Sequence, residues 1–279
     1  MGDLQMVRDL HSLIDVLLGS DKIHGLMVLG EAGIGKTYNV LKYLEERDVI
    51  YSLMKTYSTP LSLYKYLYQH RNDRLIVMDD VDGIWENPHS AAILKSALWE
   101  DDMQRTIEWH STTKNLGEVP TSFEFNAKII FICNKTRDNP HINAVLSRIL
   151  HYKFAYTREE LLDIMREICK QKTGFALDQF EKREVVDFIE KNASIFDFRT
   201  MIQGFAIREQ SKFNKNIDWK STFLSILQGE ANRELKYIYD LSKSDVPVEE
   251  QCNDFCKKFG KSRRTFFYYR AKLRDSGCL

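Results

Sequence analysis

The chain has 279 residues, of which 43% are hydrophobic and 29% charged, enough apolar material for one or two globular domains and a small appendage. Lys plus Arg and Asp plus Glu both number 40, so the net charge is zero and nucleic-acid binding depends on how charge is distributed locally. No stretch approaches the roughly 18 apolar residues of a membrane helix, and the N-terminus lacks a secretory signal pattern, so we expect no membrane association.

The first half of the chain alternates between apolar strands and amphipathic helices. Short apolar runs predict strands at 26–29, 75–78 and 128–133, with a weaker pattern at 49–53. Helical spacing of apolar residues predicts helices at 4–18, 37–47, 61–70 and 91–99. Because strands alternate with helices, we expect an α/β fold with a parallel sheet covered by helices on both faces.

The second half of the chain has no clear strand patterns after about Tyr156. Helices are expected at 157–173, 177–192, 198–212 and 219–228, and Thr157 with Glu160 fits a capping box that opens the first. From about residue 230 the chain stays helical but becomes more basic. We therefore expect a nucleotide-binding core over 1–156, an all-helical domain over 157–229 and a small helical domain over 230–279.

The cysteines indicate a reducing compartment. There are five, an odd number without a framework of paired spacings, as expected for reduced thiols. Cys252 and Cys256 stand four residues apart, but no second Cys or His pair follows at zinc-finger spacing, so buried thiols are favoured over a metal site. The expected location is the cytoplasm, or the cytoplasm of a host if the chain is viral.

Residues 30–37 match the phosphate-binding pattern G-x-x-x-x-G-K-[ST] between a predicted strand and a predicted helix. Glycines let the backbone N–H groups turn toward phosphates, and the following helix adds its positive N-terminal end. In this pattern Lys36 reaches the β- and γ-phosphates and Thr37 places its hydroxyl on Mg²⁺, so ATP and Mg²⁺ are the expected ligands. The expected nucleotide-binding residues are Gly30, Gly33, Ile34, Gly35, Lys36, Thr37 and Tyr38.

An apolar strand ends in the adjacent carboxylates Asp79 and Asp80. A phosphate loop of this kind needs a carboxylate at such a strand end to hold the Mg²⁺ shell, and Asp79 is the expected residue together with Thr37.

With these two motifs in place, residues 4–228 resemble the AAA+ ATPase family, in its clamp-loader or initiator-like form. The resemblance implies that Asn134, after the strand ending in Cys133, is the sensor 1 residue that helps to orient water and the γ-phosphate. It also implies that Arg148, in a segment similar to the serine-arginine element of clamp loaders, is an arginine finger that enters a neighbouring subunit's site. Arg199 matches the sensor 2 arginine that contacts the γ-phosphate.

The resemblance also leaves specific alternatives open. Many related ATPases have, at the position after Asp79, a Glu that polarises the attacking water, and the resemblance assigns this catalytic role to Asp80. Because Asp is one methylene shorter, hydrolysis is expected to be slow or to draw on Asp82. The alternative is that Asp80 is a strand-end acid without a catalytic role. Arg148 is alternatively a surface arginine that caps a helix end, and Arg199 an arginine paired with a surface acid.

Residues 95–99 and 105–109 are similar to a group of AAA+ proteins from phages and other mobile elements. The segment 100–107 falls where many family members carry a pore loop that grips a polymer, either DNA or protein. The acids at 100–102 make a simple grip on DNA less obvious. Trp99 and Trp109 belong either to this segment or to the core.

The basic C-terminal segment predicts a helix-turn-helix. An amphipathic helix is expected at 248–259, Gly260 allows a tight turn, and Ser262 caps a helix at 263–273. A first helix at 231–242 completes a three-helix unit. The second helix of this motif presents its N-terminal residues to DNA bases, and the expected DNA-binding residues are Lys261, Ser262, Arg263, Arg264, Thr265, Tyr268 and Arg270. The alternative is a helical bundle whose basic face is solvated or used for oligomerisation.

Together these features predict an ATP-hydrolysing homo-oligomer, a ring that is hexameric by family resemblance, acting on DNA or nucleoprotein complexes. Replication initiation, loading of a helicase or clamp, and remodelling are the expected tasks, with a protein partner such as a helicase. Two alternatives are a protein-remodelling motor with a partner-binding tail, and a slowly hydrolysing, nucleotide-gated DNA-binding switch.

Overall fold

The computed structural model describes residues 5–56, 59–100, 104–110, 116–134, 140–193, 195–227, 230–244 and 246–275. The chain divides into two compact units, Met1–Ala155 and Tyr156–Leu279. The further division of the second unit at residues 229 and 230 stays a prediction.

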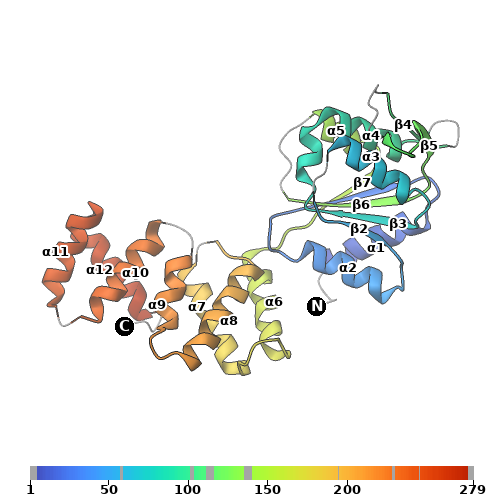
Figure 1. The fold of residues 1–279 in the computed structure, drawn as a ribbon. Helices are drawn as coiled ribbons and strands as arrows, with labels where there is room; N and C mark the ends of the chain where they lie inside the picture. Colours follow the sequence, from blue (N-terminus) through green and yellow to red (C-terminus); the bar gives the residue numbers. More distant parts are fainter. Residues whose placement is uncertain are drawn as a thin grey trace. The chain divides into compact units, whose positions relative to one another are not determined.

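The first unit is built on a parallel sheet (Figure 1). Its strands are β1 (Gly25–Leu29), β2 (Ser52–Met54), β3 (Leu75–Asp79), β6 (Lys128–Cys133) and β7 (Leu150–Lys153), in the order β2-β3-β6-β1-β7. Every pairing in this sheet is parallel. The order places the carboxyl ends of β1, β3 and β6 side by side, which is where loops that follow parallel strands form ligand sites.

Helices cover both faces of this sheet, as the sequence predicts (Figure 1). One face carries α1 (Gln5–Gly19) and α2 (Lys36–Glu46), and the other carries α3 (Pro60–Gln69), α4 (Pro88–Leu98) and α5 (Pro140–Leu146). Strands β1, β3 and β6 are buried along almost their whole length. Their sequences are therefore continuous apolar runs rather than alternating ones, and the α/β fold class is confirmed.

Three strands were not predicted from the sequence. Strand β7 has alternating half-buried and exposed residues at the edge of the sheet, so it has no apolar run to reveal it. Strands β4 (Thr106–Glu108) and β5 (Ser122–Glu124) form an antiparallel pair in which each strand buries one residue. The weaker strand pattern at 49–53 corresponds to β2, which begins three residues later.

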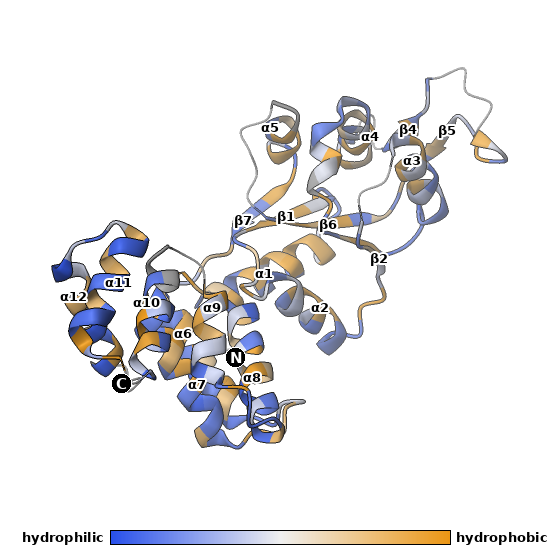
Figure 2. Cartoon of the chain, turned by 60° about the vertical axis from the view of Figure 1, so that its left-hand side comes forward, coloured by the Kyte–Doolittle hydropathy of each residue, from blue (hydrophilic) through white to orange (hydrophobic). Residues whose placement is uncertain are grey.

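The second unit is entirely helical in its described residues. Its helices are α6 (Arg158–Lys170), α7 (Gln179–Asn192), α8 (Phe198–Phe213), α9 (Trp219–Ile226), α10 (Glu230–Ser242), α11 (Val248–Phe259) and α12 (Arg263–Asp275). Figure 2 shows these helices with both hydrophobic and hydrophilic stretches, in keeping with one buried face each. The capping box predicted at Thr157 and Glu160 is confirmed, and similar boxes open α7 and α8.

One hydrophobic core runs through the whole helical unit. Phe188 and Phe223 from the middle helices belong to the same buried cluster as Phe255, Phe266 and Leu273 from α11 and α12. The last two helices therefore share buried contacts with the helices that precede them. Point substitutions on their surface are safer tests of function than truncation, because truncation removes core residues.

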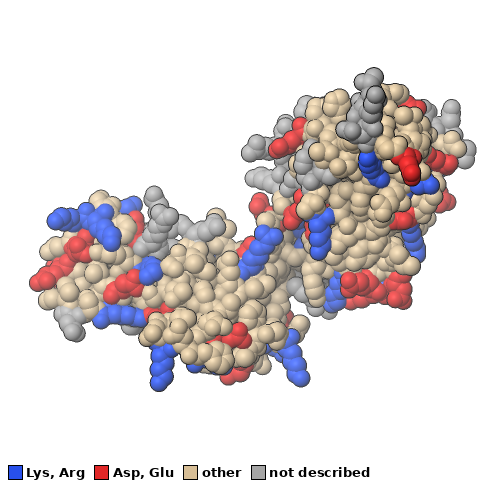
Figure 3. All heavy atoms as spheres, in the orientation of Figure 1, with Lys and Arg blue, Asp and Glu red and all other residues tan. Residues whose placement is uncertain are grey.

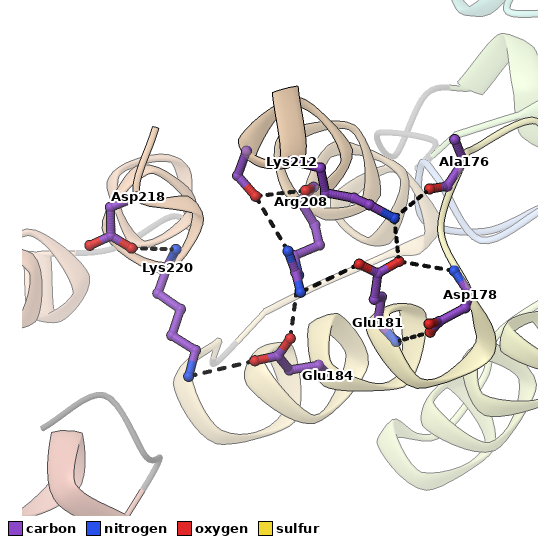
Figure 4. Close-up of polar contacts among 9 residues, drawn as sticks. Ala176, Asp178, Glu181, Glu184, Arg208, Lys212, Asp218 and Lys220 are labelled. Carbon is purple, nitrogen blue, oxygen red and sulfur yellow. Dashed lines mark hydrogen bonds and ion pairs between the residues drawn. The ribbon is translucent and has the colours of Figure 1, made fainter. Parts of the chain in front are cut away.

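A network of ion pairs also ties α7, α8 and α9 together (Figure 4). Glu181 on α7 contacts Lys212 at 2.8 Å and Arg208 at 3.6 Å, both from α8. Glu184 contacts Arg208 at 3.3 Å and Lys220 of α9 at 3.8 Å. These cations serve the structure of the helical unit.

Candidate nucleotide-binding site

The loop after β1 has the backbone geometry of a phosphate cradle. A side chain at Gly30 would place its Cβ 2.1 Å from the carbonyl oxygen of Phe154, so only glycine fits there. Gly33 and Gly35 have φ angles of 75° and 84°, in the left-handed region that favours glycine. Gly35 is the N-cap of α2, and glycine has no side chain that could accept a capping hydrogen bond. The first N–H groups of α2 therefore face the loop without a side-chain cap.

Lys36 lies inside this loop, with only 5% of its surface exposed. Its Nζ donates to the carbonyl oxygens of Gly30 at 2.8 Å and Glu31 at 2.7 Å, and to Oδ1 of Asn134 at 3.1 Å. The pairing of Leu29 with Cys133 in neighbouring strands brings Asn134 beside the loop. The Lys36 ammonium group thus donates to neutral oxygen atoms in this structure. Charged phosphate oxygens would be stronger acceptors for the same group.

Thr37 and Asp79 form the second part of the site. The Thr37 hydroxyl donates to Oδ1 of Asp79 at 3.0 Å. Burial raises the pKa of the Asp79 carboxyl, and the neighbouring charge of Asp80 raises it further, while the Thr37 hydrogen bond and Lys36 act in the opposite direction. A hydroxyl and a carboxylate in contact beside a phosphate loop fit Mg²⁺, which prefers oxygen ligands and usually binds one or two carboxylates together with substrate phosphates.

Asp80 follows in an unusual backbone conformation. Its φ of 54° lies in the left-handed region, which is uncommon for residues other than glycine and often marks a functional site. Its side chain is exposed, and Oδ1 accepts a hydrogen bond from Nδ2 of Asn134 at 3.2 Å. Asn134 therefore bridges Lys36 and Asp80. The Asp82 side chain lies outside the described part of the chain.

The two remaining residues of the predicted nucleotide site, Ile34 and Tyr38, differ in exposure. Ile34 is buried at 7% exposure, while Tyr38 on the first turn of α2 is 53% exposed with Lys42 5.7 Å from its ring centre. An exposed aromatic ring next to the cradle leaves room for a base or ribose to pack against it.

The raised pKa of Asp79 predicts that the ionised carboxylate, the form that would bind Mg²⁺, lowers the stability of the fold. Because this pKa is higher in the folded than in the unfolded chain, the ionised carboxyl destabilises the fold at neutral pH, and the cost disappears as pH falls through the raised value. Asp79→Asn is therefore expected to raise Tm by about a few degrees at neutral pH, with the difference shrinking toward about pH 4. Thermal unfolding across this range measures it.

The control for this prediction is Asp21→Asn, which changes an exposed acid in the same unit. It should leave Tm nearly unchanged across the same pH range. A lower Tm for Asp79→Asn at neutral pH would show that the carboxylate stabilises the fold and would contradict the assignment.

The two arginines implied by the family resemblance lie in different units. Arg148 follows α5, donates from Nη1 to the Ala144 carbonyl oxygen, and has its guanidinium carbon 5.4 Å from the ring centre of Trp99. Arg199 lies in the first turn of α8, after the capping residue Asp197, and is exposed. The described residues provide no carboxylate partner within ion-pair distance for either arginine. Their proposed roles stay predictions.

The two tryptophans near the predicted pore-loop segment have different environments. Trp109 packs against the core of the first unit, whereas Trp99 is 58% exposed. Asp101 and Asp102, which the sequence places in this segment, lie outside the described residues.

The turn between α11 and α12 has the glycine and the serine cap that the sequence predicts, and the helix-turn-helix itself stays a prediction. Gly260 ends α11 with a φ of 63°, and the Ser262 hydroxyl accepts a hydrogen bond from the Thr265 amide at 3.3 Å at the start of α12. Lys and Arg side chains gather over the end of α11 and α12 (Figure 3). Whether these residues contact DNA stays a prediction.

Several of the predicted DNA-binding residues have partners within the unit. Arg263 forms a double hydrogen bond with Glu249 at 2.5 and 2.6 Å, and Lys261 lies 3.6 Å from the buried carboxylate of Glu234. Arg270 donates to the side-chain oxygen of Gln251 at 2.9 Å. Arg264 and Tyr268 are exposed, with no ion pair to Arg264 among the described residues. Sequence patterns do not reveal such partners, because the partners lie on other helices.

The fold and the site together define a phosphate-loop α/β core followed by a helical unit. Solved structures of other proteins have a similar fold. Structures of RuvB from Thermotoga maritima share it: a mutant form has a TM-score of 0.54 at 16% identity, covering 97% of this chain and 87% of RuvB. The RuvB Holliday junction branch migration motor gives a TM-score of 0.51 at 15% identity over the same shares. At this identity the likeness shows the fold alone, an α/β core followed by a helical unit.

A curated sequence relative comes from Enterobacteria phage T4. It is an uncharacterized 36.7 kDa protein in the nrdC-mobD intergenic region, 28% identical over 182 residues, which are 59% of this chain. The match covers 54% of the phage protein, so the chain spans about half the length of the curated relative it matches. No protein-family model matches the sequence. None of the helices in the described part of the chain is both long and apolar enough to cross a membrane.

Proposed function

We propose that the protein is an AAA+ ATPase that acts as a homo-oligomer on DNA or on nucleoprotein complexes. The observation that carries the proposal is the convergence of Lys36, Thr37, Asp79 and Asn134 at the carboxyl edge of three adjacent parallel strands. A cation, a hydroxyl, a carboxylate and an amide around a glycine cradle are the groups that phosphoryl transfer needs.

In this proposal the site works mainly by positioning and charge. Loop amides and Lys36 hold the β- and γ-phosphates, and the exposed face of Tyr38 is available to the nucleoside. Mg²⁺, held through Thr37 and Asp79, would neutralise charge on the phosphates when bound. Asp80 and Asn134 orient the attacking water, because their hydrogen bond already fixes the carboxylate and the amide with respect to each other at 3.2 Å.

The proposal includes an assembly. Arg148 would supply the γ-phosphate of a neighbouring subunit with a positive charge, and Arg199 would contact the γ-phosphate from the helical unit. A ring, hexameric by the family resemblance, would bring these groups together. The tasks that we propose for such an assembly are replication initiation, loading of a helicase or clamp, or remodelling of a nucleoprotein complex, with a protein partner such as a helicase.

The DNA contact is proposed for the exposed face of α12. Arg264, Phe267, Tyr268 and Ala271 are exposed and recur at helical spacing, so they form one stripe. The stripe combines a guanidinium with aromatic rings, the groups that bind phosphates and bases. The exposed Arg263–Glu249 pair stabilises the unit little and can give way to a phosphate.

Arg264→Ala is expected to weaken DNA binding by roughly tenfold at low salt, because it removes one cation from the stripe. It should also reduce the slope of log affinity against log salt by about 1. Fluorescence anisotropy of labelled duplex DNA at several salt concentrations measures both. Lys215→Ala removes an exposed cation from the loop after α8 and should change neither value. Equal losses in the two variants would contradict a specific surface on α12.

A slow, nucleotide-gated switch is the second candidate, and one observation favours it. Asp80 is one methylene shorter than a glutamate, so its carboxylate reaches less far toward an attacking water. If reach limits hydrolysis, Asp80→Glu should increase the rate of phosphate release by about tenfold with ATP affinity unchanged. Phosphate release at saturating ATP tests this. A rate that falls in Asp80→Glu would show that the site is built around aspartate. If the protein does not bind DNA, the remaining alternative is a motor that remodels proteins and binds its partner through the C-terminal helices.

A further inference from the structure

The exposure of Trp99 requires an explanation. Indole rings are usually largely buried, yet Trp99 is 58% exposed while Trp85 and Trp219 are exposed by 4% and 9%. Trp99 directly follows α4, where its backbone N–H bonds to the Lys95 carbonyl oxygen. This hydrogen bond fixes the backbone that carries the ring.

The ring of Trp99 lies next to Arg148. The guanidinium carbon of Arg148 is 5.4 Å from the ring centre, within the range of a cation–π contact. Both side chains line a hollow of about 1070 Å³ on the first unit. The hydrogen bonds of Arg148 in the described part of the chain, to Ala144 and Ser147, all use Nη1.

Among the residues that the structure describes, no carboxylate in the hollow forms an ion pair with Arg148. Among its described lining residues the one carboxylate is Glu108, and Glu108 accepts a hydrogen bond from His110 at 2.8 Å. A carboxylate partner would form charge-assisted bonds that must break before the guanidinium can bind a phosphate. An aromatic ring attracts the cation without occupying its N–H donors.

We propose that Trp99 is a positioning residue that holds Arg148 ready to enter the site of a neighbouring subunit. This inference rests on the proposed role of Arg148 as an arginine finger. It assigns to Trp99 an effect on hydrolysis in the neighbour and none on nucleotide binding in its own subunit. The contacts of Trp99 among the described residues include neither the phosphate loop nor Asp79, so its effect passes through Arg148.

The test mixes two inactive variants that complement each other. Asp80→Asn supplies Arg148 but has an impaired site, and Arg148→Ala supplies an intact site but no finger. Trp99→Leu is then added to one partner at a time, and phosphate release from the mixture is measured. In the Asp80→Asn partner it should lower the restored rate by about threefold to fivefold. In the Arg148→Ala partner it should have no effect.

The same substitution thus serves as its own control, and each outcome has one meaning. Equal losses from both placements, or no loss from either, would overturn the role of Trp99. A mixture that restores no activity with Trp99 intact would instead contradict the shared site and hence the proposed function.

Trp99→Phe in the Asp80→Asn partner should keep most of the restored rate, because it retains a ring. Acrylamide quenching of Trp99 should also increase in Arg148→Ala, when the guanidinium no longer covers the indole.

Discussion

Lys36→Ala is expected to lower ATP affinity by at least about a hundredfold, because the substitution removes the one ammonium group inside the described phosphate loop. Lys36 is 5% exposed, and its three acceptors come from both sides of the cradle. The substitution therefore removes the positive charge that would contact the phosphates and the hydrogen bond between the loop and Asn134. Equilibrium titration with a fluorescent ATP analogue measures the change.

Lys42→Ala is the matched control for Lys36. Lys42 lies on the same helix, is exposed, and pairs with Glu46 at 3.6 Å. Its removal should leave ATP affinity within about twofold of the unchanged chain, since an exposed cation of this kind contributes little. ATP affinity that survives Lys36→Ala would show that the nucleotide binds elsewhere.

Arg148→Ala is expected to leave ATP affinity unchanged and to reduce kcat on the order of a thousandfold, the effect of losing an arginine finger. Arg148 follows α5, and its side chain contacts Ala144 and Trp99. Neither of these residues belongs to the phosphate loop. Binding within one subunit should therefore continue. Arg74→Ala removes an exposed arginine from the same unit and should retain both binding and turnover.

Mixing Arg148→Ala with Asp80→Asn tests whether the site is shared. Each variant lacks a different part, so mixed assemblies contain some interfaces with an intact finger facing an intact site. Phosphate release should reappear in the mixture and reach its highest value near equal proportions. Failure of the mixture at every ratio would support the alternative that Arg148 only caps the end of α5, which its bond to Ala144 already does.

The parts of the fold that the sequence predicted are those with a strong local signal. The strand at Lys128–Cys133 and the helix at Val248–Phe259 have the predicted bounds, because a buried apolar run and a capped amphipathic helix are both visible locally. Strand β7 was missed because its residues are half-exposed at the sheet edge. It forms through pairing with β1, which no local pattern records.

The sequence alone names part of the candidate site, and the role of its residues stays a prediction. Its motif residues follow from glycine geometry and from the chemistry of phosphates, so Lys36 and Thr37 could be named from the sequence. The contact of Lys36 with Asn134 depends on β6 lying beside β1, and Asn134 was reached only through the family resemblance. The contact of Trp99 with Arg148 joins residues that follow two separate helices, α4 and α5, and had no sequence signal.

The most direct test of the central proposal is ATP turnover by the purified chain over a range of protein concentrations, with and without duplex and single-stranded DNA. The proposal predicts Mg²⁺-dependent turnover that rises more steeply than protein concentration, because sites form between subunits, and that increases when DNA is added. The absence of both ATP binding and turnover at every concentration would contradict it.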